Sequence, residues 1–307
     1  MSDKEAIFQQ IRKSPGLRLA VFFGSFFFLL LISSGISTFI SEDKGISLRD
    51  RQLWMSVIQN ILAFCLPAII LARFASNRPL VWLKLNKNPG IKPFIGVILI
   101  YLITMPAMEW LIAWNSGLTF PEALAPLDKL LRDWENSSNA IAESLLKADN
   151  WWAVCIGTLV IGILTGFSEE IFFRGGLQGL FMHTAMGKKA AVWLAAFIFS
   201  TLHFQFFGFF PRLLMGAFFG YLLYWTGSLW VPVFAHTLNN GMIVILSGIF
   251  GHVSIIPDTG LENADEFFIP LGSLILSIIF FLYFRQFFFE TGKRNLNHGK
   301  KEQYNRI

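Results

Sequence analysis

The sequence predicts an all-α membrane protein, a polytopic bundle of about eight transmembrane helices with a polar site inside the membrane. Of its 307 residues, 54% are hydrophobic and only 15% are charged, against about 25% charged in a typical soluble domain. The apolar residues form long runs, several of about 20 residues, which is the length a helix needs to cross the hydrocarbon of a bilayer. Ionisable side chains nevertheless occur inside some of these runs, where their cost marks a functional site.

Each apolar run is expected to be a helix, because only helices and closed barrels satisfy every backbone polar group in lipid. The runs form one transmembrane domain at residues 19–289, between an N-terminal tail at 1–18 and a basic C-terminal tail at 290–307. The motifs described below fall within residues 166–241. The fifth and sixth runs are short. The expected spans are 19–40, 54–72, 94–114, 151–173, 190–203, 213–225, 229–250 and 267–289.

Lysine and arginine predict the orientation of the spans. They gather before the first span, between the second and third, after the fourth and after the eighth; the group after the fourth is Arg174, Lys188 and Lys189. The alternate loops are mixed or acidic, and residues 251–266 contain acidic residues but no Lys or Arg. Positive residues are enriched in cytoplasmic loops. We therefore expect an integral, multi-pass membrane protein with both termini in the cytoplasm.

The composition argues against three other classes: a soluble enzyme, a disordered protein and a disulfide scaffold. The net charge of +5 lies mostly in short loops and in the two tails. This pattern is typical of membrane topology, and we expect no nucleic-acid partner. Both cysteines, Cys65 and Cys155, lie in apolar runs and are expected to be core thiols.

The first polar cluster ends the fourth span and reads Ser-Glu-Glu-Ile-Phe-Phe-Arg from Ser168. Glu170 and Arg174 lie four residues apart on one helix face and can form an ion pair. Glu169 points about 100° away from Glu170 and is left as the free carboxylate. A free carboxylate in an apolar site suits a general base or a metal ligand.

Two histidines form the other polar clusters. His203 ends the fifth span, while His236 and Asn240 share one face of the seventh. A set of Glu169, His203 and His236 is typical of a zinc hydrolase with one open coordination position. The same groups also work without metal, if Glu169 and His203 activate a water while His236 and Asn240 stabilise an oxyanion. The residues leave both chemistries open.

Two further features of the apolar runs have less specific interpretations. Glu109 is an acid inside the third span, and the sequence assigns it no place in the site. The pairs Gly162–Gly166 and Gly216–Gly220 are spaced as G-x-x-x-G and predict close helix packing around the site.

In their order along the chain, these motifs resemble those of the CPBP intramembrane protease family, which includes type II CAAX prenyl endopeptidases and Abi-type bacteriocin-processing proteins. The family pattern is E-E-x-x-x-R, then F-x-x-x-H, then H-x-x-x-N or H-x-x-x-D. The resemblance covers about a quarter of the chain. Every position of the pattern is present here, as Glu169, Glu170 and Arg174, then Phe199 and His203, then His236 and Asn240.

The resemblance implies peptide-bond hydrolysis at a site that is sunk in the membrane and open to the cytoplasm. It implies that the water is activated by Glu and His, with or without Zn²⁺ bound. The substrate would be a peptide or a lipid-associated protein in contact with membrane lipid. Catalysis would fall to Glu169, His203, His236 and Asn240, supported by Glu170, Arg174 and Phe199.

The leading hypothesis is therefore an intramembrane endopeptidase of CAAX-protease type. One alternative is a non-catalytic immunity or scaffold protein that binds a membrane peptide, although binding alone does not require both histidines and Glu169. The other is a proton or ion transporter, against which the sequence shows no inverted repeat.

The expected spans place the proposed catalytic groups at different depths. A span that ends at Phe173 puts Glu169 near the cytoplasmic face, whereas His203 lies about 22 Å above that face if counted from Lys188. A single site then requires residues 175–189 to enter the bundle or lie along it, or the fourth span to begin earlier. The glycines at 175, 176 and 179 would permit a break in the helix there.

Overall fold

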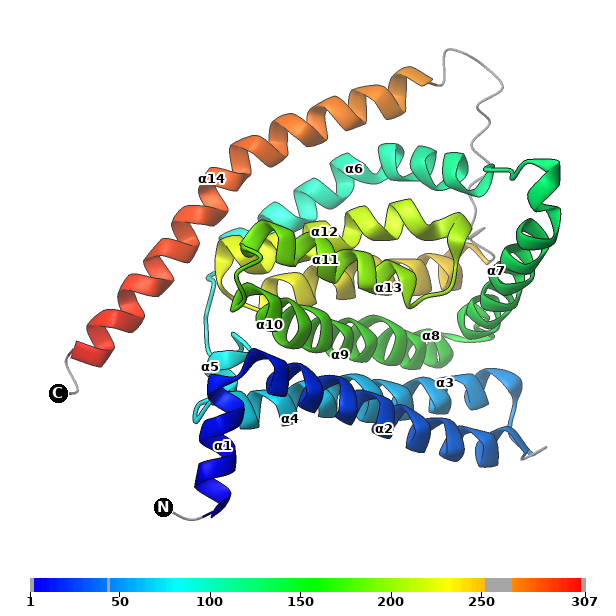
Figure 1. Ribbon diagram of the computed structural model, residues 1–307. Helices are drawn as coiled ribbons and strands as arrows, with labels where there is room; N and C mark the ends of the chain where they lie inside the picture. The colour runs from blue at the N-terminus through cyan, green and yellow to red at the C-terminus, as the bar shows by residue number, and fades with distance from the viewer. Residues whose placement is uncertain (1–2, 43–44, 252–266, 305–307) are drawn as a thin grey trace.

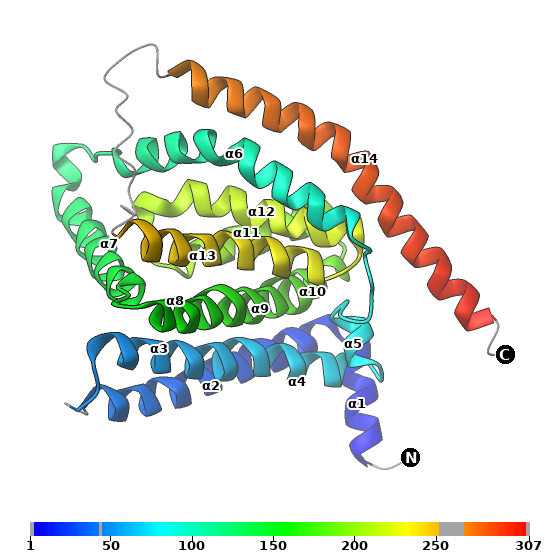
Figure 2. The same ribbon diagram turned by 180° about the vertical axis from the view of Figure 1, so that it is seen from behind.

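The computed structural model describes residues 3–42, 45–251 and 267–304, and within these ranges every regular element is a helix (Figure 1). This confirms the predicted fold class, a polytopic helical membrane protein. The chain forms an N-terminal helical hairpin, a central group of buried helices and an outer pair of long helices that cover the group from the other side (Figures 1 and 2).

The N-terminal hairpin is built from two long arms. Residues predicted as a tail form α1 (Asp3–Lys13) and the start of the first arm, α2 (Pro15–Glu42). The second arm runs through α3 (Leu48–Gln59), the π-helix η1 (Asn60–Cys65) and α4 (Leu66–Ala75), and packs along α2. A single turn, α5 (Pro79–Trp82), then leads into the rest of the chain.

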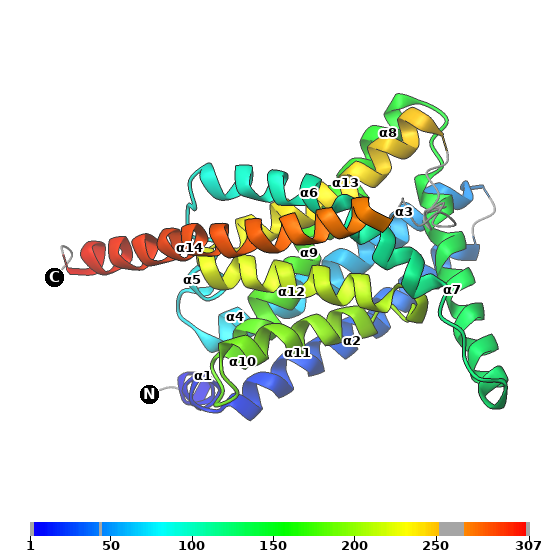
Figure 3. The same cartoon turned by 90° about the horizontal axis from the view of Figure 1, so that it is seen from above.

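The next segment crosses the bundle and covers one of its ends. Helix α6 (Lys92–Ser116) is long and apolar, and the 3-10 turn η2 (Glu122–Leu124) connects it to α7 (Ala125–Leu146). Helix α7 is amphipathic and lies across the end of the long helices, as the view from above shows (Figure 3). Both termini lie at the opposite end of the molecule (Figures 1 and 2).

A continuous helical rod from Trp151 to Met182 runs through the middle of the protein. It consists of α8 (Trp151–Gly157), η3 (Thr158–Leu164), α9 (Thr165–Glu170), η4 (Ile171–Gln178) and α10 (Gly179–Met182), of which η3 and η4 are π-helical. Short π segments widen a helical turn and are frequent at functional sites. Here they flank α9, which carries the two adjacent glutamates.

The remaining helices surround this rod. They are α11 (Lys188–Thr201), the 3-10 turn η5 (Phe206–Gly208), α12 (Phe209–Thr226), α13 (Trp230–Phe250) and α14 (Phe268–Tyr304). Helices α11 and α13 pack directly against the rod, whereas α14 packs outside α6 and α12. Residues 290–304, predicted as part of a tail, continue α14.

Within the described residues seven helices, not eight, are long and apolar enough to cross a membrane. The predicted span at 190–203 corresponds to α11, whose 14 residues reach only about 21 Å, short of the hydrocarbon thickness of about 30 Å. The other runs correspond to Pro15–Ile40, Leu48–Ala75, Lys92–Ser116, Trp151–Met182, Phe206–Thr226, Trp230–Phe250 and Phe268–Gln286.

The predicted fourth span was too short, because the rod continues for nine residues beyond Phe173, to Met182. Arg174 is 1% exposed, so its assignment to a cytoplasmic loop was wrong. The predicted helix break is also absent. A Cβ at Gly176 would lie 2.8 Å from the Phe22 ring and one at Gly175 would lie 3.0 Å from Leu83, so these glycines serve close packing.

The continuous rod removes the difference in depth between the proposed catalytic groups. At about 1.5 Å per residue, Glu169 lies about 20 Å from Met182, and His203 lies about 22 Å from Lys188, which follows the same turn. Both residues are therefore at a similar depth in the bundle.

Glycine pairs allow the helices around the rod to approach closely, as their spacing predicts. A Cβ at Gly166 would lie 2.9 Å from the backbone nitrogen of Thr237 on α13, and one at Gly162 would lie 3.1 Å from the Cα of Gly241. On α12, a Cβ at Gly216 would lie 3.1 Å from the Phe199 ring. The structure thus confirms that these glycines hold α13 against the rod and α12 against α11.

Candidate active site

The candidate site lies where the rod, α11, α12 and α13 meet. Glu169 and Glu170 come from α9, and His203 follows the end of α11. His236 and Asn240 come from successive turns of α13. The short approach between α9 and α13 that Gly166 permits is what brings the histidine of one helix to the glutamates of the other.

Glu170 is the centre of a buried, charge-assisted network. Its Oε1 accepts hydrogen bonds from Arg174 Nη1 at 2.8 Å and from His236 Nδ1 at 2.8 Å. Glu170 is 0% exposed, and Arg174 and His236 are almost fully buried. The predicted ion pair between Glu170 and Arg174 is confirmed, and it lies in the protein interior. Such a pair holds the two side chains firmly in place, because removing either partner leaves the other as an uncompensated buried charge.

Aromatic rings enclose the Arg174 guanidinium. Its Cζ lies 4.7 Å from the centroid of the Phe199 ring and 5.4 Å from that of Phe219. Its Nη2 donates to the backbone oxygen of Gly216 at 2.9 Å. The Phe219 ring also stacks on His236, with 5.1 Å between centroids. Arg174 therefore joins the rod to α11 and α12, and the same rings hold the imidazole of His236.

Glu169 is the carboxylate outside this network, as the helix-face argument predicts. Its Oε2 lies 3.8 Å from His236 Nε2, beyond direct hydrogen-bonding distance. Its side chain retains 12% exposure, whereas that of Glu170 is fully buried. The two nitrogens of His236 thus face two different carboxylates: Nδ1 donates to Glu170, and Nε2 faces Glu169.

Phe199 lies between the two histidines. Its backbone oxygen accepts a hydrogen bond from His203 Nδ1 at 2.7 Å, which leaves Nε2 of that ring for other chemistry. The Phe199 ring meets His203 edge to face at 4.8 Å and His236 edge to face at 6.0 Å, measured between centroids. This explains why a phenylalanine is placed four residues before the histidine.

Asn240 lies one turn beyond His236 on α13 and is partly buried. Its Nδ2 donates to the backbone oxygen of Ile161 in the rod at 3.4 Å, and its Oδ1 accepts from Asn239 Nδ2 at 3.1 Å. Glu109, in contrast, is exposed on α6, and in the part of the chain that the structure describes no hydrogen bond or ion pair joins it to these groups.

Three polar residues beside His203 escaped the sequence analysis: Gln205, Arg212 and Glu135. Gln205 Nε2 donates to Glu135 Oε1 at 3.3 Å, and Arg212 Nη2 donates to Gln205 Oε1 at 2.8 Å. Glu135 Oε2 also accepts from the backbone N–H of Phe207 at 3.1 Å. Burial raises the pKa of Glu135, against the opposing effect of these hydrogen bonds. The available signal was Arg212 itself, a charged residue that immediately precedes the predicted span at 213–225.

A second network ties the N-terminal hairpin to α9, which carries the two adjacent glutamates. The Ser168 hydroxyl donates to Asn60 Oδ1, and Asn60 Nδ2 donates to Thr165 Oγ1 at 3.0 Å. Asn60 belongs to η1 and is 4% exposed. A buried amide in lipid needs such partners, so the hairpin is fixed against the rod directly beside Glu169.

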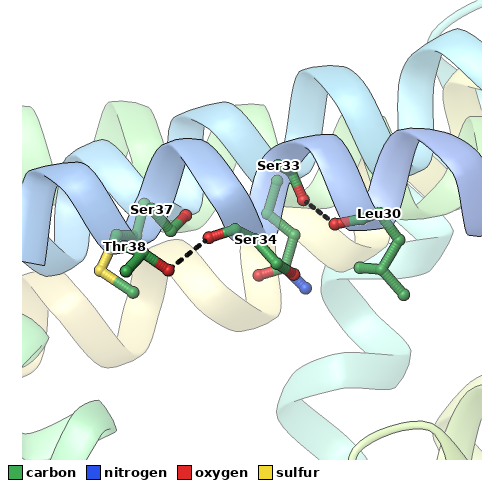
Figure 4. Close-up of a pocket in the computed structure, with 7 residues that line it drawn as sticks. Leu30, Ser33, Ser34, Ser37 and Thr38 are labelled. Carbon is green, nitrogen blue, oxygen red and sulfur yellow. Dashed lines mark hydrogen bonds between the residues drawn. The ribbon is translucent and has the colours of Figure 1, made fainter.

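The structure also contains a polar hollow of about 320 Å³ at the surface between α2 and α3 (Figure 4). The Ser33 and Thr38 hydroxyls donate to the backbone oxygens of Leu30 and Ser34 on their own helix. None of the residues named above for the candidate site lines this hollow. Its lining consists of Leu30, Ser33, Ser34, Ser37, Thr38, Met55 and Gln59.

Residues 150–242 match the family model described as type II CAAX prenyl endopeptidase Rce1-like. This segment is Rce1-like. It includes every motif position on which the resemblance to CPBP proteases rests, so the predicted relationship is confirmed. No curated protein and no solved structure gives a significant match to the chain. The seven apolar helices indicate an integral, multi-pass membrane protein, and the matched segment is similar to a family of membrane proteases.

Zinc binding by Glu169, His203 and His236 stays a prediction. In the part of the chain that the structure describes, no three His, Cys, Asp or Glu side chains converge closely enough to hold a metal ion. The proposed reaction therefore uses the side chains alone.

Proposed function

We propose that the protein is an intramembrane endopeptidase in which Glu169 and His203 activate a water molecule while His236 and Asn240 stabilise the oxyanion. The observation that carries this proposal is the division of labour between the adjacent glutamates. Glu170 fixes His236 through Nδ1, while Glu169 faces Nε2 of the same ring at 3.8 Å and has no direct hydrogen-bond partner there. One carboxylate orients and the other is available to react.

In the proposed reaction, a water beside Glu169 gives its proton to that carboxylate and attacks the carbonyl carbon of the substrate. His203 orients the water through Nε2, because its Nδ1 is bonded to Phe199. The developing oxyanion accepts hydrogen bonds from His236 Nε2–H and from the Asn240 amide. Glu169 then returns the proton to the leaving nitrogen, and the products are a carboxylic acid and an amine.

We propose a peptide or a lipid-associated protein as the substrate, since a site buried among membrane helices selects segments that partition into lipid. We also propose that both termini are cytoplasmic, from the distribution of Lys and Arg. The basic loop between α4 and α6 lies at the same end of the bundle as the two termini, in agreement with this orientation (Figure 1).

Cleavage by the purified protein tests this function. Wild type and Glu169→Gln, in detergent, are incubated with a library of acylated and prenylated peptides, and the products are identified by mass spectrometry. We expect wild type to cleave the peptides and Glu169→Gln to cleave them at least about 10³-fold more slowly. This factor lies in the upper part of the rate enhancement of about 10²–10⁴ that general-base catalysis provides. Glu109→Gln, another acid of a membrane helix, is the matched control and should retain activity.

Two results would contradict the proposal: cleavage by Glu169→Gln at the wild-type rate, or the same loss in Glu109→Gln. The metal content of the same samples decides the prediction of zinc. A stoichiometry of about one zinc per chain, lost together with activity on chelation, would establish a metalloprotease.

A further inference from the structure

Arg212, in the first turn of α12, is a cation that the proposed reaction does not use. It is partly buried, and among the described residues both of its hydrogen bonds go to Gln205. Nη2 donates to the side-chain oxygen at 2.8 Å, and Nη1 donates to the backbone oxygen at 3.5 Å. Within the described part of the chain no carboxylate forms an ion pair with this guanidinium. Arg212 is thus a charged side chain inside the bundle whose hydrogen-bond partners are neutral.

The location of Arg212 relates it to the candidate site. It interacts electrostatically with both proposed water-activating residues, Glu169 and His203. A Cβ at Gly208 would lie 3.0 Å from Arg212 Nη2, so the chain at η5 has no side chain where the guanidinium lies. The free donors of Arg212 therefore belong to the same polar region as the reacting groups.

The orientation of Arg212 is fixed from α7. The Gln205 amide that accepts from the guanidinium donates in turn to Glu135 Oε1 at 3.3 Å and to Asn139 Oδ1 at 3.2 Å. Because its Nε2 is held by these two residues, Gln205 presents its Oε1 toward Arg212. This chain of contacts holds the guanidinium in place and leaves most of its five N–H donors unused.

We propose that Arg212 binds a carboxylate of the peptide substrate and so places the peptide against Glu169 and His203. This proposal rests on the function proposed above. A guanidinium matches the planar carboxylate with two parallel hydrogen bonds. A partly buried cation without an ion pair is costly, and a ligand that supplies the opposite charge removes that cost. Glu135 and Glu169 both attract this guanidinium electrostatically, but within the described residues neither forms an ion pair with it.

Two carboxylates of a peptide offer the required chemistry, the C-terminal α-carboxylate and an acidic side chain. Four sets of one acylated peptide library distinguish them. The C-terminus is prepared either as the free acid or as the amide. Each of these two forms is made once with Asp and Glu in the peptide sequence and once with Asn and Gln in their place. Binding is measured with Glu169→Gln in detergent, so that hydrolysis does not consume the probe.

We expect at least one acidic set to bind about tenfold or more tightly than its matched amide set. This preference for the acidic set should disappear in Glu169→Gln/Arg212→Gln. It should weaken in Glu169→Gln/Arg212→Lys, because lysine keeps the positive charge but lacks the two parallel N–H donors of the guanidinium. Glu169→Gln/Arg132→Gln is the matched control. Arg132 lies at the same end of the molecule, but it pairs with Asp128 and covers the Phe207 ring. Thermal unfolding of each variant shows that it is folded.

The proposal is overturned if acid and amide sets bind equally, if the preference survives Arg212→Gln, or if no set binds. A preference that follows the C-terminus assigns the α-carboxylate, and one that follows the side chains assigns Asp or Glu. Failure of the proposed function looks different: wild type would bind acidic peptides through Arg212 and cleave none of them.

Discussion

At the scale of single residues, the site depends on adjacent glutamates with opposite environments. Glu170 is fully buried, and one of its oxygens accepts hydrogen bonds from both Arg174 and His236. Glu169 keeps some exposure, and its Oε2 lies too far from His236 Nε2 for a direct hydrogen bond. Residues adjacent in a helix point about 100° apart, so the same turn supplies one carboxylate that orients His236 and another that we propose to react. The difference in role follows from this geometry alone.

We expect Glu170→Gln to lower both stability and activity. The amide cannot neutralise Arg174, and breaking a buried pair by removing one partner costs about 3–5 kcal/mol. It also weakens the hydrogen bond that orients His236. Thermal unfolding in detergent and the cleavage rate should both fall. Glu169→Gln should instead lose activity with little change in unfolding temperature. Equal unfolding temperatures for the two variants would contradict this division of roles.

At the scale of helices, close approach of α9 and α13 makes the site. Gly166 faces the backbone of Thr237, one residue after His236, and leaves no room for a side chain. The packing distance between these helices therefore determines how far His236 lies from both glutamates.

We expect Gly166→Ala to reduce activity strongly, because its Cβ would lie 2.9 Å from Thr237 N and 3.2 Å from Thr237 Cα, and backbone atoms cannot rotate away. Overpacking of this kind costs about 1–3 kcal/mol. The matched control is Gly24→Ala in α2, where an added Cβ meets nothing within 4 Å. The check is the cleavage rate together with the unfolding temperature of both variants. Similar activities for the two would contradict the proposed role of Gly166.

The helix scale also explains which parts of the structure the sequence predicted. Seven spans and the face shared by Glu170 and Arg174 follow from apolar length and helical spacing, which are local properties. The extension of the rod to Met182 was missed because Arg174 interrupts the apolar run, and its burial depends on Phe199, Phe219 and Gly216 from other helices. Arg212 was missed for the same reason. Local sequence patterns cannot predict that a charged side chain is buried when its partners come from helices distant in the sequence.

At the scale of the whole molecule, the polar groups beside the site point toward the end covered by α7. Gln205, Glu135 and Asn139 continue from His203 in that direction. On the opposite side the site borders a continuous apolar core that includes Phe173, Leu177 and Leu223. Water for hydrolysis is therefore expected from the α7 end, and both termini lie at the other end (Figure 1).

If both termini are cytoplasmic, this geometry places access to the site on the non-cytoplasmic side, whereas the resemblance alone implied the cytoplasmic side.

Single cysteines introduced into a Cys65→Ala/Cys155→Ala background test the orientation. Ser137→Cys lies on α7 and Lys189→Cys lies beside the turn between α10 and α11, and both positions are exposed. In sealed right-side-out vesicles, we expect a membrane-impermeant maleimide to label Ser137→Cys at once and Lys189→Cys only after permeabilisation. An acylated acidic peptide added outside the same vesicles should be cleaved without permeabilisation, because we expect Glu169 to receive water and substrate from the α7 end. Labelling in the reverse order would refute the orientation, and cleavage that requires permeabilisation would refute the direction of access.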